Sequence, residues 1–340
     1  MSLFGLGRSQ IPFDMFDLRL NATEARRAEK LANIYHRGQE LQWNGRRVLG
    51  ELLDKHGGVH VAADKRAALM RIFSILMWGE LAAWKVSAQL ADRLVPLGAK
   101  LAASSQVHDE ARHFYVMYDY LSLHGPVPTR IDRPARALLD IVLETDDLCL
   151  KLSGMQLLIE TIALTIFQAV RESGVEPVLC ELLRYYEKDE ARHVGLGLQH
   201  LPVMLRSLPR HRAIALLLAQ AQVMGWAMAE LKLLEDDLRT IGVDPRRVFT
   251  LGLSKQALAF EALARETGAG PTVEGEIVNR LMTAAGEALF PDEQAQAGGV
   301  WGRLRAMQRA LRGMVAPDLP PSSIDPDAPA ARPAGRGARN

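Results

Sequence analysis

The pentapeptide Asp-Glu-Ala-Arg-His occurs twice in this chain, at residues 109–113 and again at residues 189–193. The shift that superimposes Asp109 on Asp189 also superimposes Glu80 on Glu160. Each of these two glutamates lies in an apolar stretch, and each precedes the glutamate of its own pentapeptide by the same interval. The chain therefore repeats one pattern, a Glu followed by Glu-x-x-His, although its two halves share little else.

The middle of the chain is predicted to be helical, because apolar residues recur at steps of three and four and no long alternating run interrupts them. Glu80 precedes a connecting turn that starts at Leu94, and Glu110 follows Gly98 on the far side of that turn by a similar interval. At about 1.5 Å per residue, the helix rises roughly 21 Å from Glu80 to the turn, and the next helix returns roughly 18 Å from the turn to Glu110. Glu110 therefore lies at about the same height in the bundle as Glu80. The second half behaves in the same way. The four helices are expected over residues 64–94, 99–123, 146–174 and 176–205.

Within each pentapeptide the Glu and the His are three residues apart, so both side chains project from one helix face. Docking the two hairpins gives an all-α four-helix bundle in which four carboxylates and two imidazoles converge at mid-height. Four buried acids cannot stay ionised together without compensating positive charge, which two divalent cations would supply. Oxygen ligands with one imidazole per metal favour iron or manganese over a structural zinc site. The candidate ligands are Glu80, Glu110, His113, Glu160, Glu190 and His193.

Further regions flank the predicted bundle of residues 64–205. Residues 1–63 form a helical N-terminal lead-in, and residues 206–315 add C-terminal helices. Residues 316–340 contain six prolines and few large apolar groups, so this tail is predicted to be disordered. The additional helices are expected over residues 21–56, 135–144, 211–240, 245–267 and 273–311.

Charge and composition exclude several classes of function. The 41 Lys and Arg nearly balance the 40 Asp and Glu, so net charge gives no reason to expect nucleic acid as a partner. Two cysteines are too few for a disulfide framework, and the stretch from Met1 to Leu20 lacks the apolar core of a signal peptide, which predicts a cytoplasmic protein. Residues 152–170 are nearly long enough to cross a bilayer, but Glu160 would be costly in lipid. They are interpreted as a core helix, and no transmembrane segment is expected.

At these motifs the chain resembles the ferritin-like di-iron carboxylate superfamily, over about residues 64–205. The Asp-Glu-x-Arg-His form is similar to that of the hydroxylase subunits of bacterial multicomponent monooxygenases and of acyl carrier protein desaturases. The resemblance implies a ferritin-like bundle that holds two iron ions, with a manganese–iron pair as the alternative. One ion would be held by Glu80, Glu110 and His113 and the other by Glu160, Glu190 and His193, with one or more glutamates bridging.

The resemblance also implies a role for the aspartate that opens each pentapeptide. Asp109 and Asp189 would each accept a hydrogen bond from the imidazole of the opposite hairpin, which fixes the ring and its tautomer. The alternative is an i,i+3 ion pair with Arg112 or Arg192, and the two interpretations do not exclude each other.

Three positions depart from the patterns of named subfamilies. Met117 stands where the small subunit of class I ribonucleotide reductase places its radical tyrosine, which argues against a radical-storing subunit. Leu164 stands where multicomponent monooxygenases usually carry a threonine. Tyr186 stands where aminoarene N-oxygenases supply an additional histidine. No named subfamily is therefore assigned.

A substrate cavity is predicted beside the metals. Gly195 and Gly197 lie inside a predicted helix, where each costs roughly 1 kcal/mol against alanine, and small residues beside a metal leave space. The cavity is therefore expected on the Gly197 side. The alternative is that the apolar residues one turn from the ligands are ordinary bundle core. The predicted lining residues are Trp84, Phe114, Met117, Leu164, Phe167 and Gly197.

Three functions follow from these features. The first is an O2-activating oxygenase or oxidase that hydroxylates, desaturates or N-oxygenates a small or medium organic substrate, with electrons from a separate ferredoxin or reductase. The second is a ferritin- or rubrerythrin-like ferroxidase or peroxide scavenger, and the third is a metal-free helical interaction protein. The duplicated ligand set and the additional helices favour the first. A homodimer is expected, and the acid-free residues 301–315 form either a solvated helix or a docking surface for an anionic partner or membrane.

Overall fold

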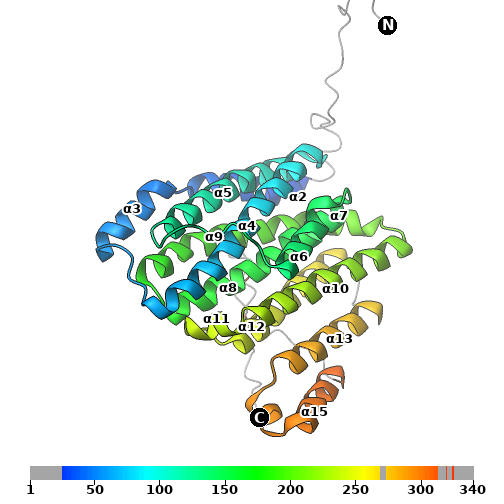
Figure 1. The fold of residues 1–340 in the computed structure, drawn as a ribbon. Helices are drawn as coiled ribbons and strands as arrows, with labels where there is room; N and C mark the ends of the chain where they lie inside the picture. The colour runs from blue at the N-terminus through cyan, green and yellow to red at the C-terminus, as the bar shows by residue number, and fades with distance from the viewer. Residues whose placement is uncertain (1–24, 269–272, 313–318, 320–323, 325–340) are drawn as a thin grey trace, which may run out of the picture.

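The computed structural model describes residues 25–268 and 273–312, together with 319 and 324. Within these residues the secondary structure is helical and contains no strand (Figure 1). The tail predicted to be disordered lies outside the described residues except at Leu319 and Ile324. Ile324 is buried against the main apolar core, with Leu319 packed beside it, so the chain is not solvated at this point of the tail.

Four long helices form the predicted bundle. They are α4 (Ala63–Arg93), α5 (Leu97–Ser122), the continuous helix Leu148–Ser173, whose last part is α8 (Glu160–Ser173), and α9 (Pro177–Arg206). Helix α4 packs along α5, and α8 packs along α9, so each half of the sequence repeat forms an antiparallel hairpin. The second turn is sharply defined: Gly174 ends α8 with a positive φ of 66°, and Glu176 accepts hydrogen bonds from the backbone N–H groups of Val178 and Leu179.

The helix that carries Glu160 departs from a regular α-helix. It begins as α7 (Leu148–Lys151), continues as a π-helix, η2 (Leu152–Ile159), and becomes α8 at Glu160. The backbone N–H of Glu160 bonds to the carbonyl of Met155, five residues back. Such π segments are uncommon and occur frequently at functional sites. The sequence predicted one long helix here, and it gave no signal for the wider turn.

The N-terminal helices cover one side of the bundle. Helix α2 (Ala25–Glu40) packs on α5 and α9, and α3 (Gly45–His56) packs on the same pair. The helical lead-in expected over 21–56 consists of two helices in its described part, because Asn44 caps α3 by accepting a hydrogen bond from the N–H of Arg47. The break places Trp43 inward, where it is buried.

The C-terminal helices cover another side. The connecting helix α6 (Arg133–Glu144) packs on α10 (Arg210–Leu233), and α12 (Pro245–Thr267) packs on α8 and α9. The expected helix over 211–240 divides into α10 and α11 (Glu235–Thr240) at Leu234. The prediction of one helix over 273–311 is wrong, because the first helix of this region ends before Pro291. The region consists of α13 (Val273–Leu289), α14 (Glu293–Ala297) and α15 (Gly299–Arg312), with α13 and α15 at the edge of the molecule (Figure 1).

The bundle interior contains two apolar clusters with a polar layer between them. Along α4, residues 68–77 belong to one cluster and residues 82–94 to the other, so Glu80 falls at the boundary. On α8 the change occurs across Glu160, and on α5 and α9 it occurs across the two pentapeptides. The four helices therefore carry their ionisable residues at one height, as the hairpin arithmetic predicted.

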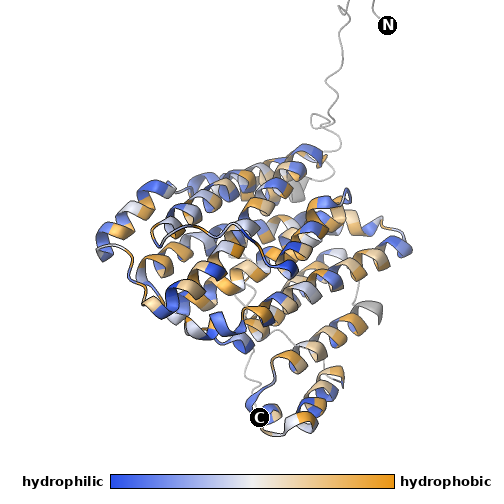
Figure 2. Cartoon of the chain, in the orientation of Figure 1, coloured by the Kyte–Doolittle hydropathy of each residue, from blue (hydrophilic) through white to orange (hydrophobic). Residues whose placement is uncertain are grey.

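Three helices are long and apolar enough to cross a membrane by length and composition: α4, the helix Leu148–Ser173, and α10. In the second of these, 78% of the apolar window is buried inside the protein, which agrees with its interpretation as a core helix. Helix α10 differs, because only 17% of its window is buried although much of the helix is apolar (Figure 2), and Ile214 and Leu218 are exposed. That no segment spans a membrane stays a prediction.

Candidate metal centre

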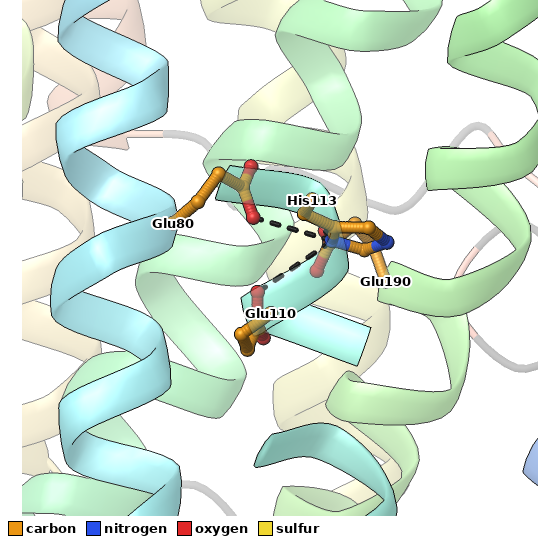
Figure 3. Close-up of side chains that lie close together, drawn as sticks. All are labelled: Glu80, Glu110, His113 and Glu190. Carbon is orange, nitrogen blue, oxygen red and sulfur yellow. Dashed lines mark hydrogen bonds and ion pairs between the residues drawn. The ribbon is translucent and has the colours of Figure 1, made fainter. Parts of the chain in front are cut away.

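The structure brings the six predicted ligands together in the polar layer. Each is at most 4% exposed. They form two overlapping groups in which every residue offers one ligand atom and these atoms lie within 4.8 Å of one another. The first group, drawn in Figure 3, is Glu80, Glu110, His113 and Glu190, and the second is Glu110, Glu160, Glu190 and His193.

The overlap of the two groups sharpens the assignment of ligands. Glu110 and Glu190 belong to both groups, whereas Glu80 and Glu160 each belong to one. The shared pair comes from α5 and α9, which face each other across the bundle, and the unshared pair comes from α4 and α8. Two cations held by these groups would therefore share Glu110 and Glu190, whereas Glu80 and Glu160 would each serve one cation.

Both imidazoles point Nδ1 into the carboxylate layer. Nδ1 of His113 lies 3.2 Å from Oε2 of Glu80 and 3.1 Å from Oε1 of Glu190. Nδ1 of His193 lies 3.0 Å from Oε1 of Glu110 and 2.9 Å from Oε2 of Glu190. One N–H cannot serve all of the oxygens around each ring, whereas a cation can be shared among them.

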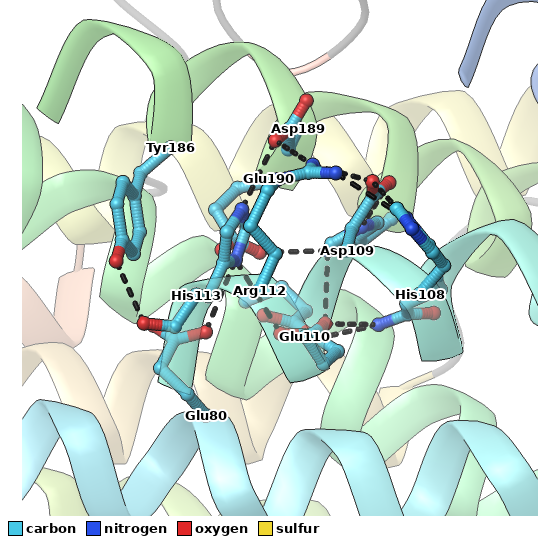
Figure 4. Close-up of polar contacts among 12 residues, drawn as sticks. Glu80, His108, Asp109, Glu110, Arg112, His113, Tyr186, Asp189 and Glu190 are labelled. Carbon is cyan, nitrogen blue, oxygen red and sulfur yellow. Dashed lines mark hydrogen bonds and ion pairs between the residues drawn. The ribbon is translucent and has the colours of Figure 1, made fainter. Parts of the chain in front are cut away.

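The other ring nitrogens meet the aspartates of the opposite half of the repeat. Nε2 of His113 lies 3.0 Å from Oδ2 of Asp189 (Figure 4), and Nε2 of His193 lies 3.4 Å from Oδ2 of Asp109. An acceptor at Nε2 holds the proton there and leaves the Nδ1 lone pair free to bind a metal. This is the crossed arrangement that the resemblance implied.

The alternative interpretation of the aspartates is present at the same time. Arg112 Nη2 donates to Asp109 over 2.6 Å and to Asp189 over 2.7 Å. Arg192 Nη2 donates to Asp189 over 2.6 Å and to Asp109 over 3.0 Å. All four side chains are buried, so two guanidinium groups and two carboxylates form a closed square of opposite charges. The square connects the two hairpins and fixes the carboxylates that orient the imidazoles.

The charges in the centre perturb one another strongly. Burial raises the pKa of Glu80 well above its usual range, and the charge of Glu190 raises it further; the pKa of Glu160 is raised for the same two reasons. Burial also favours neutral His193, but the charges of Glu110 and Glu190 outweigh it and raise the pKa of that imidazole. The cluster therefore needs positive charge, from protons or from cations.

The donor set fits a pair of divalent cations. The four carboxylates carry four negative charges, which two such ions would neutralise, and each ion would receive one imidazole nitrogen with oxygen ligands around it. Oε2 of Glu110 and Oε1 of Glu190 are buried and make no hydrogen bond among the described residues, although Nδ1 of His113 lies 3.5 and 3.1 Å from them. Buried carboxylate oxygens are seldom left unsatisfied, so these two atoms are available as metal ligands.

Three contacting residues were not predicted from the sequence. Gln106 Nε2 donates to Glu110 over 2.9 Å and to Glu160 over 2.8 Å. Trp43 Nε1 donates to Asp189 over 2.8 Å from the N-terminal segment. Tyr186 stacks on His113 with ring centroids 4.2 Å apart. Gln106 and Tyr186 each lie one turn before a ligand Glu, which is the signal that could have found them, whereas Trp43 has no such signal.

An apolar cavity of about 150 Å³ adjoins the centre on the side of Glu80 and Glu160. It is bordered by α4, α6, α8, α10, α11 and α12. The lining residues of α4 recur at intervals of three and four residues, so they lie on one face of the helix. Glu80 lies on that same face. These α4 lining residues are Ile72, Ile75, Leu76, Gly79, Glu80 and Ala83.

The cavity predicted on the Gly197 side is wrong. A Cβ added at Gly197 would lie 2.8 Å from Cδ2 of Leu157 and 3.1 Å from Cβ of Gln156, so this glycine permits close packing of α9 against the π-helix. None of the six predicted residues lines the observed cavity. Met117, Leu164 and Phe167 are buried core, which was the alternative interpretation. Phe114 packs against the apolar cluster that contains Met117 and Phe167, and Trp84 is 37% exposed.

No protein-family model and no curated protein matches this sequence. Two variants of the R2-like ligand-binding oxidase with an aerobically reconstituted Mn/Fe cofactor have similar solved structures, with TM-scores of 0.53 and 0.54 at 16% and 15% identity. Each alignment covers 69% of this chain and 94% or 93% of the oxidase. Protein 19 with aldehyde deformylating oxidase activity from Synechococcus is 18% identical over 61% of this chain and 94% of its own, with a TM-score of 0.47. The likeness to the oxidase confirms the predicted fold: the chain is an all-α protein with a ferritin-like four-helix bundle, extended by N- and C-terminal helices.

Proposed function

We propose that this protein is a non-haem di-iron oxidase or oxygenase that uses O2 to oxidise a small organic substrate. The observation that carries the proposal is the pair of overlapping, fully buried ligand groups beside an apolar cavity. The oxidases with the same fold include proteins whose cofactor is Mn/Fe, so a manganese–iron pair is the second possible loading. When bound, the two ions would supply the redox chemistry that reduces O2 and activates it toward the substrate.

The four glutamates of the centre are proposed to have two different roles. Glu110 and Glu190 would be shared by the two ions, because each belongs to both ligand groups. Glu80 and Glu160 are proposed as terminal ligands, and both also line the cavity. Because Glu80 and Glu160 border the cavity, they would bring the bound ions next to a substrate held there.

The cavity is proposed to hold the organic substrate. Its wall is built mainly from aliphatic side chains of α4, α6, α8 and α10, with Phe249 from α12, so it excludes water from the oxygens of Glu80 and Glu160. An engineered apolar cavity of about 150 Å³ binds benzene, which indicates a substrate of comparable cross-section. Insertion of one oxygen atom from O2 consumes two electrons and two protons, and we propose a ferredoxin or a reductase as their source.

Metal loading and O2 consumption test the proposal. The full chain is loaded anaerobically with Fe(II), the bound iron is quantified, and O2 uptake is followed with a chemical reductant, in the presence and absence of small apolar compounds. About two ions per chain are expected, and O2 uptake should yield oxidised organic product. The matched controls are Glu190→Ala, which removes a shared ligand, and Glu187→Ala, which removes a partly buried acid that pairs with Arg171 on the neighbouring helix.

Two results would refute the proposal in different ways. A protein that binds no iron or manganese would remove the whole class of function. A protein that oxidises Fe(II) at a rate that no organic compound changes, and that yields no organic product, would instead be a ferroxidase, the alternative expected from the sequence. Location in the cytoplasm and a homodimeric state remain further proposals, which fractionation and size-exclusion chromatography would test.

A further inference from the structure

Glu230 is a lining acid of the cavity that does not belong to the metal centre. It lies on α10 and is 8% exposed. Its Oε2 accepts a hydrogen bond of 3.1 Å from the backbone N–H of Ala135, in the first turn of α6. Its Oε1 is buried and has no hydrogen-bond partner among the described residues. Burial, together with the charge and the close approach of the Asp132 carboxyl group, raises the pKa of Glu230 to about 7.

The charges around Glu230 are not balanced. Arg71 Nη2 donates to Asp132 over 2.7 Å, and its Nη1 donates to Asp237 over 2.7 Å. Asp132 also lies close enough to Glu230 to interact with it. Among the described residues in contact here, three carboxyl groups thus share one guanidinium. Arg71 and Asp132 are partly exposed, whereas Glu230 is buried in the cavity wall, so Glu230 is the member of the cluster that faces the cavity.

We propose that Oε1 of Glu230 binds the ammonium group of the substrate, which is therefore a slender apolar amine. The site offers a free buried acceptor and an excess of negative charge, and an ammonium group satisfies both. A hydroxyl group would satisfy only the acceptor, and a carboxylate would be repelled. The proposal rests on the proposed function in taking this cavity for the substrate site, and it names the class of substrate.

The geometry of α4 fixes the orientation of such a substrate. Arg71, which anchors the acidic cluster, precedes Glu80 by nine residues on this helix, a rise of roughly 13 Å. An amine held at Glu230 directs its apolar chain along the cavity toward Glu80 and Glu160. The nitrogen then lies away from the metal centre, so the atom that is oxidised is a carbon.

Binding of three probes of equal chain length tests the proposal. The iron-loaded full chain is titrated calorimetrically, without O2, with n-octylamine, octan-1-ol and octanoate. Octylamine is expected to bind about tenfold or more tightly than octanol, the usual gain from a hydrogen bond to a charged group. In Glu230→Gln, which keeps the shape and the acceptor for Ala135, the octylamine affinity should fall to that of octanol. Glu261→Gln removes an exposed acid of α12 and should change nothing.

Gly79→Leu locates the binding event. Gly79 lines the cavity, and a Cβ added there would meet no atom within 4 Å, so the leucine side chain can enter the cavity without a clash. A folded Gly79→Leu protein, verified by its circular dichroism and Tm, should lose binding of octylamine and octanol together. Retention of octylamine binding by this variant would place the amine elsewhere and overturn the proposal.

A purely structural role of Glu230 predicts a different outcome. If the carboxyl group permanently shares a proton with Asp132 and only caps α6, Glu230→Gln mimics its protonated form and leaves octylamine affinity unchanged. That result, or octanoate as the tightest probe, would overturn the proposal. The binding data are independent of turnover: Glu230-dependent octylamine binding by a protein that consumes no O2 would refute the proposed function alone. If the protein oxidised substrates that bind equally well to the wild type and to Glu230→Gln, the amine site alone would be refuted.

Discussion

Substitutions at Gly79 and Gly197 test on which side of the candidate metal centre the apolar cavity lies. Both are helical glycines next to the metal centre, and each should lose about 1 kcal/mol of helix stability relative to alanine. A Cβ at Gly79 meets nothing within 4 Å, whereas one at Gly197 comes within 2.8 Å of Leu157. Gly79→Ala should therefore raise the free energy of unfolding by about 0.5–1 kcal/mol.

Gly197→Ala is expected to behave in the opposite way. It gains the same helix propensity, but overpacking against Leu157 and Gln156 costs about 1–3 kcal/mol, so the net change should lie between about zero and a 2 kcal/mol loss. Urea unfolding followed by circular dichroism measures both values at unchanged m, with the two variants compared under one metal loading. If Gly197→Ala stabilised the protein and Gly79→Ala destabilised it, the open space would lie at Gly197 and the close packing at Gly79, which would contradict the structure.

The larger substitution connects this space to function. Gly79→Leu should abolish oxidation of organic compounds and leave the iron content unchanged, because the cavity is filled while the ligands stay in place. Gly197→Leu should instead reduce the yield of folded, metal-loaded protein, because it displaces the π-helix that precedes Glu160. Full turnover by a folded, iron-loaded Gly79→Leu protein would show that the substrate does not use this cavity.

Three further predictions concern ligands, hydrogen bonds and pH. Glu110→Ala, which removes a ligand shared by both groups, should bind less metal than Glu80→Ala, and equal losses by elemental analysis would contradict the shared role. Asp109→Asn replaces the carboxylate at Nε2 of His193 and should weaken metal binding about 10–100-fold in a chelator competition, whereas unchanged affinity would assign the aspartate to the ion pairs alone. Burial lowers the pKa of Lys255 to about 8 from 10.5, so the unfolded chain binds more protons in this window and the free energy of unfolding should rise from pH 8 to pH 10.5. Lys255→Met should be more stable at neutral pH, by up to about 3 kcal/mol, and should lack this rise in urea titrations.

The bundle and the convergence of its six ionisable residues could be predicted because both depend on distances along single helices. The internal repeat places four glutamates by counting residues to a turn, and Glu-x-x-His needs only the pitch of an α-helix. Even the crossed contacts of Asp109 and Asp189 follow once the two hairpins dock face to face. These features are local in sequence or related by one symmetry, so one chain suffices to find them.

The cavity could not be predicted, because its wall depends on how distant helices pack. Helices α10 and α12 supply much of the wall, and no repeat relates them to the bundle. The glycine signal is also ambiguous: a helical glycine marks free space at Gly79 and close packing at Gly197. Trp43 reaches the centre from a break between two N-terminal helices, whose position depends on the Asn44 cap and on tertiary contacts.

The crossed pairs His113–Asp189 and His193–Asp109 have the pattern of an isologous interface, in which residue i of one partner meets residue j of the other and the reverse also holds. Here the two partners are halves of a single polypeptide. In an isolated hairpin, the histidine would lack the aspartate that accepts its hydrogen bond. The arginine would pair with one aspartate, whereas in the whole chain it pairs with two. If the chain were divided between the hairpins, metal affinity would depend on the concentrations of both fragments, since the two sites can only be assembled jointly.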